Sequence, residues 1–196
     1  MYLDTVHIRP ADPTDAADAI RLFGALHQHN TQLDPHFVLA EGWEQLVEEY
    51  LRESQQADES VWLLACDNGT AIGFVLVEVH TDSPLYRHRR WAEIVGLYVD
   101  PAYRGTIVAH TLMEHAYAWA IDHHLRIMQL YVTATNEPAQ RFYSKQGFDT
   151  SQVIMRRRCS SDDLIDPELP APQHQRLHFS ESGARPMNMH DRQQYE

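Results

Sequence analysis

The spacing of apolar residues predicts a strand and two helices in the N-terminal part of the chain. Residues 5–9 alternate between apolar and polar, which is typical of a strand. Asp12 and Pro13 suit the start of a helix, because Asp caps a helix N-terminus and Pro fits its first turn, and this helix is expected to run to about His27. After a loop over residues 29–40, a second helix is predicted from residues at helical spacing: Trp43, Leu46, Val47, Tyr50 and Leu51.

A hairpin and a further strand follow. Residues 61–66 and 71–80 are mostly apolar, and the four residues between them, 67–70, include Asn-Gly. Asn-Gly between apolar runs is a strong signal for a tight turn, so the two runs are expected to pair as antiparallel strands. A polar loop over residues 82–90 then leads into a β-branched, apolar strand over residues 92–99.

The second half of the chain alternates between helices and strands. A long helix is expected to start near Arg104, with an apolar face made of Val108, Leu112, Ala116, Trp119 and Ala120. The next strand is predicted over residues 127–133. Asn136 is a good N-cap for a short helix that Gly147 stops, and residues 148–158 should form the last strand or pair of strands. The predicted order is β-α-α-β-β-β-α-β-α-β.

Composition narrows the class of protein. The 196 residues suit one domain, and the net charge of −12 argues against nucleic acid or an anionic membrane as the main partner. Cys66 and Cys159 are too few for a disulfide framework, and no His, Cys, Asp or Glu cluster has metal-ligand spacing, so no metal is expected. The chain shows neither an apolar signal segment nor a membrane-length apolar run, so a cytoplasmic protein is the default expectation.

The character of the chain changes near its end. Residues 160–196 contain four prolines and seven acidic residues against three arginines, with no helical or strand period. We therefore expect a folded domain over residues 1–159 and a polar C-terminal tail or arm over residues 160–196.

Two segments carry the strongest chemical signal. Residues 99–109 join the apolar strand to the long helix, and a strand that runs into the exposed amides of a helix N-terminus is a ready site for phosphate. Residues 136–148 form the second segment, with Asn136 at its start and Tyr143 in its middle. Taken together, the two segments resemble the GCN5-related N-acetyltransferases, the GNAT superfamily, and the resemblance extends over about residues 5–158.

The resemblance implies a mixed, mostly antiparallel α/β sheet of six to seven strands, with helices on both faces and splayed central strands. It also implies acetyl-coenzyme A as cosubstrate. The family's phosphate loop reads Arg/Gln-x-x-Gly-x-Gly/Ala, and here Arg104 and Ala109 match while Ile107 stands where Gly is expected. The cofactor-binding residues that the resemblance implies are Leu97, Tyr98, Val99, Arg104, Gly105, Thr106, Ile107, Val108, Ala109, Asn136 and Tyr143.

Two catalytic residues follow from the same resemblance. Tyr143 would be the general acid that protonates the leaving thiolate; the alternative is an aromatic that only packs. Asn136 would bond the cofactor arm, or only cap its helix. Glu93 would be the general base and lies on the same face as Leu97 and Val99 unless a bulge, for which Gly96 is the candidate, intervenes; Glu78 is a rival base.

The resulting expectation is an N-acetyltransferase that moves an acetyl group to a primary amine of a small molecule by direct attack in a ternary complex. Two alternatives stay open. One is a degenerate member of the family that binds a ligand or partner without turnover, which Ile107 favours. The other is an acetyltransferase of protein amines. Dimers are common in the family, so a homodimer is a candidate assembly.

Overall fold

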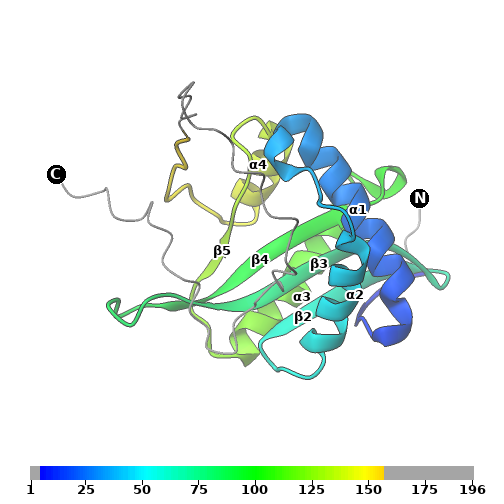
Figure 1. The fold of residues 1–196 in the computed structure, drawn as a ribbon, viewed down its shortest axis with the longest axis horizontal. Coiled ribbons are helices and arrows are strands. Elements are labelled where there is room, and N and C mark those ends of the chain that lie inside the picture. Colours follow the sequence, from blue (N-terminus) through cyan, green and yellow to red (C-terminus); the bar gives the residue numbers. More distant parts are fainter. Residues whose placement is uncertain (1–4, 157–196) are drawn as a thin grey trace.

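The computed structural model describes residues 5–156, which form a five-stranded sheet covered by helices (Figure 1). The strands lie side by side in chain order: β1 (Val6–Pro10), β2 (Ser60–Asp67), β3 (Thr70–Thr81), β4 (Arg90–Val99) and β5 (Met128–Leu130). Strands β1 to β4 are antiparallel, whereas β5 runs parallel to β4. The sheet is therefore mixed and mostly antiparallel, as expected.

The described residues contain four helices: α1 (Ala16–Leu33) and α2 (Trp43–Ser54) lie between β1 and β2, α3 (Val108–Asp122) lies between β4 and β5, and α4 (Glu137–Lys145) follows β5. A single 3-10 turn precedes α1, because the Asp12 side chain accepts from the N–H of Thr14 and holds Pro13–Asp15 in that turn. Two further 3-10 turns cover Pro35–Phe37 and Pro101–Tyr103. Within residues 5–156, no helix is long and apolar enough to cross a membrane.

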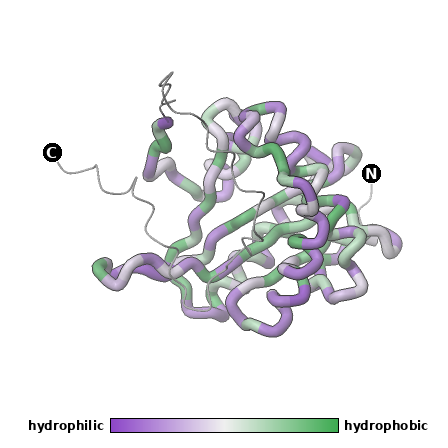
Figure 2. Tube along the Cα trace, in the orientation of Figure 1, coloured by the Kyte–Doolittle hydropathy of each residue, from purple (hydrophilic) through white to green (hydrophobic). Residues whose placement is uncertain are grey.

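The sheet separates two hydrophobic cores. On one face, α1 and α2 cover aromatic residues of β2 and β3, with Trp62, Phe74 and Leu22 fully buried. On the other face, α3 packs over alternate positions of the same strands, such as Val75 and Val77, and Phe142 and Tyr143 of α4 pack against this second core. Figure 2 shows that the hydrophobic residues concentrate along β2, β3 and β4, in the middle of the molecule. Burial on both faces explains why these strands read as continuous apolar runs.

The turn between β2 and β3 confirms the hairpin that Asn-Gly predicts. Asn68 and Gly69 both adopt left-handed backbone conformations, with φ of 48° and 82°. These angles match a tight hairpin turn, in which both central residues need positive φ. The turn sets the register in which β2 and β3 pair over most of their length.

A β-bulge interrupts the pairing of β3 with β4. Leu76 lies opposite Gly96, and the next residue, Val77, lies opposite Ile94, so Val95 is the extra residue on β4. Gly96 itself makes room for a helix rather than forming the bulge: a Cβ there would lie 3.0 Å from Leu26 of α1. The bulge was expected at Gly96 and is found one residue earlier.

Several boundaries differ from the sequence prediction. The first helix continues to Leu33, into the expected loop, and the strand predicted over residues 127–133 is confined to Met128–Leu130. The prediction of a last strand was wrong over residues 148–156, where the chain is irregular. The described part therefore has five strands instead of the expected six to seven. Residues 157–158 of that strand and the tail over residues 160–196 lie outside the described residues.

Candidate active site

Strands β4 and β5 separate after a short stretch of pairing. Residues 92–94 pair with residues 128–130, and β5 ends there while β4 continues to Val99. In Figure 1, β5 leaves the direction of β4 at a steep angle. The expected splay of the central strands is therefore present, and the second half of β4 borders no strand on its β5 side within the described chain.

Backbone groups of β4 face this open edge. The N–H of Asp100 donates to the carbonyl of Ile72 on the β3 side, at 2.8 Å. Because hydrogen-bonded and non-hydrogen-bonded residues alternate along an antiparallel pair, the N–H groups of Val99 and Leu97 point away from β3. Two backbone donors of β4 thus point to the side that β5 has left.

The loop between β4 and α3 folds back onto the same edge. The carbonyl of Val99 accepts from Arg104 Nε at 3.0 Å, and the Arg104 guanidinium lies over the Tyr98 ring, 5.4 Å from its centroid. The loop is also held by Thr106, whose hydroxyl donates to the carbonyl of Tyr103 at 2.6 Å. The N-terminus of α3 is consequently fixed beside the end of β4.

The residue of this loop that needs the conformational freedom of glycine is Gly105, not the residue at position 107. Gly105 has φ of 74°, in the left-handed region that favours glycine. Ile107 has an ordinary right-handed conformation, with φ of −72°, and its side chain is 58% exposed. The loop therefore folds without strain at Ile107. The helix starts at Val108, four residues later than the predicted Arg104, because the 3-10 turn and Gly105 take up the first residues of the segment.

Helix α4 confirms one geometric expectation for Asn136. Its side-chain oxygen accepts from the N–H of Ala139 at 3.3 Å, which caps the helix. Tyr143, in the last turn of the helix, packs edge-on against Phe142 and Phe148, with ring centroids 5.3 and 5.8 Å away. Burial raises the pKa of Tyr143 to about 12, because it disfavours the phenolate. The hydroxyl is thus firmly protonated at neutral pH.

Two acidic side chains lie buried on the α2-facing side of the sheet. Glu78 of β3 and Glu93 of β4 are directly opposite each other. Glu78 accepts from the Tyr50 hydroxyl of α2 at 2.9 Å, and Glu93 accepts from Trp91 Nε1 at 3.4 Å. His80 Nδ1 lies 3.6 Å from Glu93 Oε2. We call these five residues the β3–β4 polar cluster.

The bulge at Val95 decides which predicted residues share a face. Without it, Glu93 would lie on the face of Leu97 and Val99. With it, Glu93 belongs with Tyr98 on the α1 and α2 side, while Leu97 and Val99 pack toward α3. The structure thus brings residues 97–109 together at one edge and places the side chains of Leu97 and Val99 on the opposite face from Glu93.

Three members of the polar cluster were not foreseen from the sequence: Tyr50, His80 and Trp91. The signal was present in part, since Glu78 and His80 are two residues apart on one strand, as are Trp91 and Glu93 on the next. Residues two apart on a strand share a face. The two pairs lie opposite each other in the register of β3 with β4, which the spacing of residues within each strand does not give.

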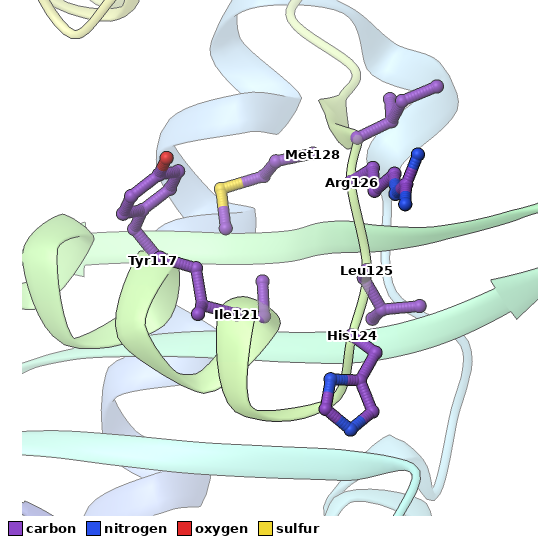
Figure 3. A pocket seen from close by; sticks show the side chains of 8 residues that line it. Tyr117, Ile121, His124, Leu125, Arg126 and Met128 are labelled. Carbon is purple, nitrogen blue, oxygen red and sulfur yellow. The ribbon is translucent and has the colours of Figure 1, made fainter.

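A separate depression lies where α3 ends and β5 begins, away from the predicted site residues. It has a volume of about 580 Å³ and is lined by Tyr117, Ala120, Ile121, His124, Leu125, Arg126, Ile127 and Met128. Figure 3 shows the side chains of Tyr117, Ile121 and Met128 beside one another at this surface. None of these residues belongs to the two sequence segments that carry the chemical signal.

Comparison with known proteins identifies the family. A model of the acetyltransferase (GNAT) family matches residues 25–148, and the chain belongs to this family. An uncharacterized N-acetyltransferase of Archaeoglobus fulgidus is 28% identical over 150 residues, covering 72% of this chain and 91% of that protein. Another, from Methanocaldococcus jannaschii, is 26% identical over 152 residues; the match covers 78% of this chain and 64% of the longer relative.

Solved structures share the fold. A mutant form of the BH1408 protein of Bacillus halodurans has a TM-score of 0.69 at 19% identity, over 79% of this chain and 99% of that one. The aminoglycoside acetyltransferase AAC(6')-Iy, in complex with a bisubstrate analogue of coenzyme A and acetylneamine, has a TM-score of 0.60 at 22% identity, with the same coverage of both chains. At these identities the likeness shows the fold.

Proposed function

We propose that this protein transfers the acetyl group of acetyl-coenzyme A to a primary amine of a small molecule. The attack is direct, in a complex that holds both reactants, and most of the acceleration comes from that placement. The observation that carries the proposal is the open edge of β4 next to the N-terminus of α3. Backbone donors at Leu97 and Val99 face the edge, and Arg104 folds the phosphate loop onto it.

Each part of the cosubstrate has a candidate partner at this edge. The backbone amides at the start of α3, from Gly105 to Ala109, suit the pyrophosphate, since a helix N-terminus directs N–H groups outward and carries a partial positive charge. Two of them, those of Thr106 and Val108, already donate weakly within the loop, at 3.4 Å. The N–H groups of Leu97 and Val99 suit the amide-bearing arm and the thioester oxygen. Asn136 caps α4 and contributes to the arm through its remaining amide donors.

Acid and base lie on different sides of the sheet. Tyr143, protonated at neutral pH, donates to the leaving thiolate from α4. Glu93 takes the proton of the attacking amine, directly or through water, from the β3–β4 polar cluster. Glu78 is the rival for that role, because it lies directly opposite and is also buried. AAC(6')-Iy, a neighbour in fold, was solved with a bisubstrate analogue that links coenzyme A to acetylneamine, which supports a small amine as acceptor.

Release of free thiol tests this function. Purified protein is mixed with acetyl-coenzyme A and a panel of primary amines, including aminoglycosides, diamines and amino acids, and the thiol is measured with a colorimetric reagent. Amine-dependent release that Tyr143→Phe and Glu93→Gln both reduce supports the proposal. Cofactor binding without release on any amine favours the degenerate binding protein instead, and release only on a lysine-containing peptide favours a protein acceptor.

A further inference from the structure

His80 and Trp91 form a stacked pair beside the buried carboxylate of Glu93. The two residues lie opposite each other on β3 and β4, with ring centroids 4.1 Å apart and planes 24° from parallel. Trp91 also donates from Nε1 to Glu93 Oε2, at 3.4 Å, and the same Glu93 oxygen lies 3.6 Å from His80 Nδ1. One indole therefore fixes both the imidazole and the carboxylate.

Burial limits how Glu93 can exchange protons with water. The Glu93 side chain is 5% exposed, whereas the His80 side chain is 13% exposed and lies nearer the loop that joins β3 to β4. A base that accepts a proton in every turnover must also lose it in every turnover. For a carboxylate enclosed in this way, the neighbouring imidazole is the group through which the proton can leave.

We propose that His80 is a positioning and proton-transfer residue that acts through Glu93. The inference rests on the proposed function, with Glu93 as the base. The proton from the acceptor amine goes to Glu93, then from the Glu93 carboxyl to Nδ1 of neutral His80. The Nε2–H of the resulting imidazolium releases a proton to solvent, which leaves the neutral ring with its proton on Nδ1. Exchange of that proton with solvent restores the Nε2–H tautomer before the next turnover. The 3.6 Å separation closes to hydrogen-bond distance by a small side-chain shift.

The charges around His80 favour this direction of transfer. The carboxylate of Glu93 on β4 lies beside His80, and Glu78, next but one to His80 on β3, accepts from the Tyr50 hydroxyl of α2. An exposed ion pair, Arg90 with Glu59 at 3.7 Å, lies at the same end of the strands. A carboxylate 3.6 Å from the ring stabilises an imidazolium.

The chain supplies a matched control for His80. His123 stacks on Trp119 at 4.0 Å and 29°, much as His80 stacks on Trp91, and its side chain is 18% exposed. It contacts the exposed Asp58 at 3.2 Å and lies at the end of α3, outside the polar cluster. A substitution at His123 removes an equivalent stacked imidazole that has no access to Glu93.

Nuclear magnetic resonance measures the coupling without any substrate. Histidine ring signals of the full chain are followed against pH in wild type and in Glu93→Gln. We expect the titration midpoint of His80 to fall by roughly one pH unit when the carboxylate becomes an amide, with the His123 signals unchanged. Equal midpoints for His80 in the two proteins would overturn the proposal.

Kinetics test the same coupling in turnover. With an accepted amine, His80→Gln should lower kcat by roughly tenfold or more near pH 7 and remove the rise of kcat with pH that neutral His80 produces. His123→Gln should leave both unchanged. Imidazole added to His80→Ala should restore part of the rate. A uniform loss at all pH values without rescue would mean that His80 only supports the fold, and the proposal would then be wrong.

The two experiments separate the inference from the proposed function. If the midpoint of His80 depends on Glu93 but no amine is acetylated, the proposed function is contradicted, and His80 then has no role in proton transfer. Acetyl transfer together with an unchanged pH profile in His80→Gln contradicts the role of His80 alone. A thermal melt of His80→Gln close to that of wild type confirms that the variant is folded in either case.

Discussion

Glu78 and Glu93 lie directly opposite each other on β3 and β4, and both are almost completely buried, at 7% and 3% exposure. Side chains in such a pair are separated by only about 5 Å at their Cβ atoms. Two acidic groups this close and this enclosed favour positive charge beside them, which a protonated amine supplies. This relationship supports the proposal that the acceptor amine loses its proton on the α2-facing side of β4.

Replacing the two carboxylates one at a time should tell which of them is the base. Glu93→Gln should lower the rate most near pH 7 and least at high pH, where the free amine is already neutral. The measurement is the rate of acetyl transfer to one amine between about pH 7 and high pH, in wild type, in Glu93→Gln and, as the matched comparison, in Glu78→Gln. An equal loss at every pH would mark Glu93 as a substrate-binding or structural residue, and a pH-dependent loss only in Glu78→Gln would move the role to β3.

Tyr143→Phe should slow turnover while leaving cofactor affinity nearly unchanged, because only the hydroxyl is lost and the ring still packs on Phe142 and Phe148. The expected loss in kcat is roughly 10²–10⁴-fold. Since burial raises the pKa of Tyr143 to about 12, the hydroxyl stays protonated throughout the neutral and mildly alkaline range, and the ratio of the two rates should not change with pH there. An unchanged rate would assign Tyr143 to packing.

Ile107→Gly should tighten the binding of acetyl-coenzyme A. The position is exposed and has a right-handed backbone, so the substitution removes a bulky side chain next to the phosphate loop without changing the turn. Calorimetric titration compares the dissociation constants. Gly105→Ala is the opposite control, since it strains a residue with φ of 74° and should weaken binding. Weaker binding in Ile107→Gly would mean that Ile107 itself contacts the cofactor.

A partly buried ion pair near the start of α1 should make stability depend on acid. Arg9 bonds both carboxylate oxygens of Asp15, at 2.6 and 2.7 Å, and the N–H of Asp12 donates to the same side chain at 2.8 Å. The Arg9 guanidinium lowers the pKa of Asp15 below its usual value near 3.8. Its contribution to stability is therefore complete above about pH 5 and is lost as the pH falls through the lowered pKa.

Asp15→Asn should accordingly lower the free energy of unfolding by about 1–3 kcal/mol at neutral pH. In acid, where Asp15 of the wild type is protonated, the free energies of unfolding of variant and wild type should be closer to each other. Denaturant unfolding at several pH values provides the measurement. Asp18→Asn is the control, because its pair with Arg21 is exposed on both sides and should contribute about 0–1 kcal/mol. Equal losses in the free energy of unfolding for the two variants would show that the pair of Arg9 with Asp15 stabilises the fold no more than an exposed pair.

The sequence predicts the elements of this fold well where the signal is local. Asn68 and Gly69 fix the hairpin, Asp12 and Pro13 mark the entrance to the first helix, and Asn136 caps the last one, as predicted. Each depends on residues within a single turn. The start of α3 at Val108 could not be placed, since Gly105 and the preceding 3-10 turn compete with helix over the same residues.

The site depends on relationships that no local pattern contains. The open edge of β4 exists because β5 stops pairing after residues 92–94, and the face of Glu93 depends on the extra residue Val95. Both are features of strand register, which is set by packing across the whole sheet. The neighbours of Glu93, His80 and Trp91, appear only when that register is known.

Binding of acetyl-coenzyme A tests the central claim most directly, since the open edge of β4 and the start of α3 are proposed to hold it. A thermal melt of the full chain with and without the cofactor needs no knowledge of the acceptor. At about 100 times the dissociation constant, the cofactor should stabilise the protein by about 2.7 kcal/mol and raise the melting temperature, whereas adenosine alone should not. No shift at millimolar acetyl-coenzyme A would contradict the account.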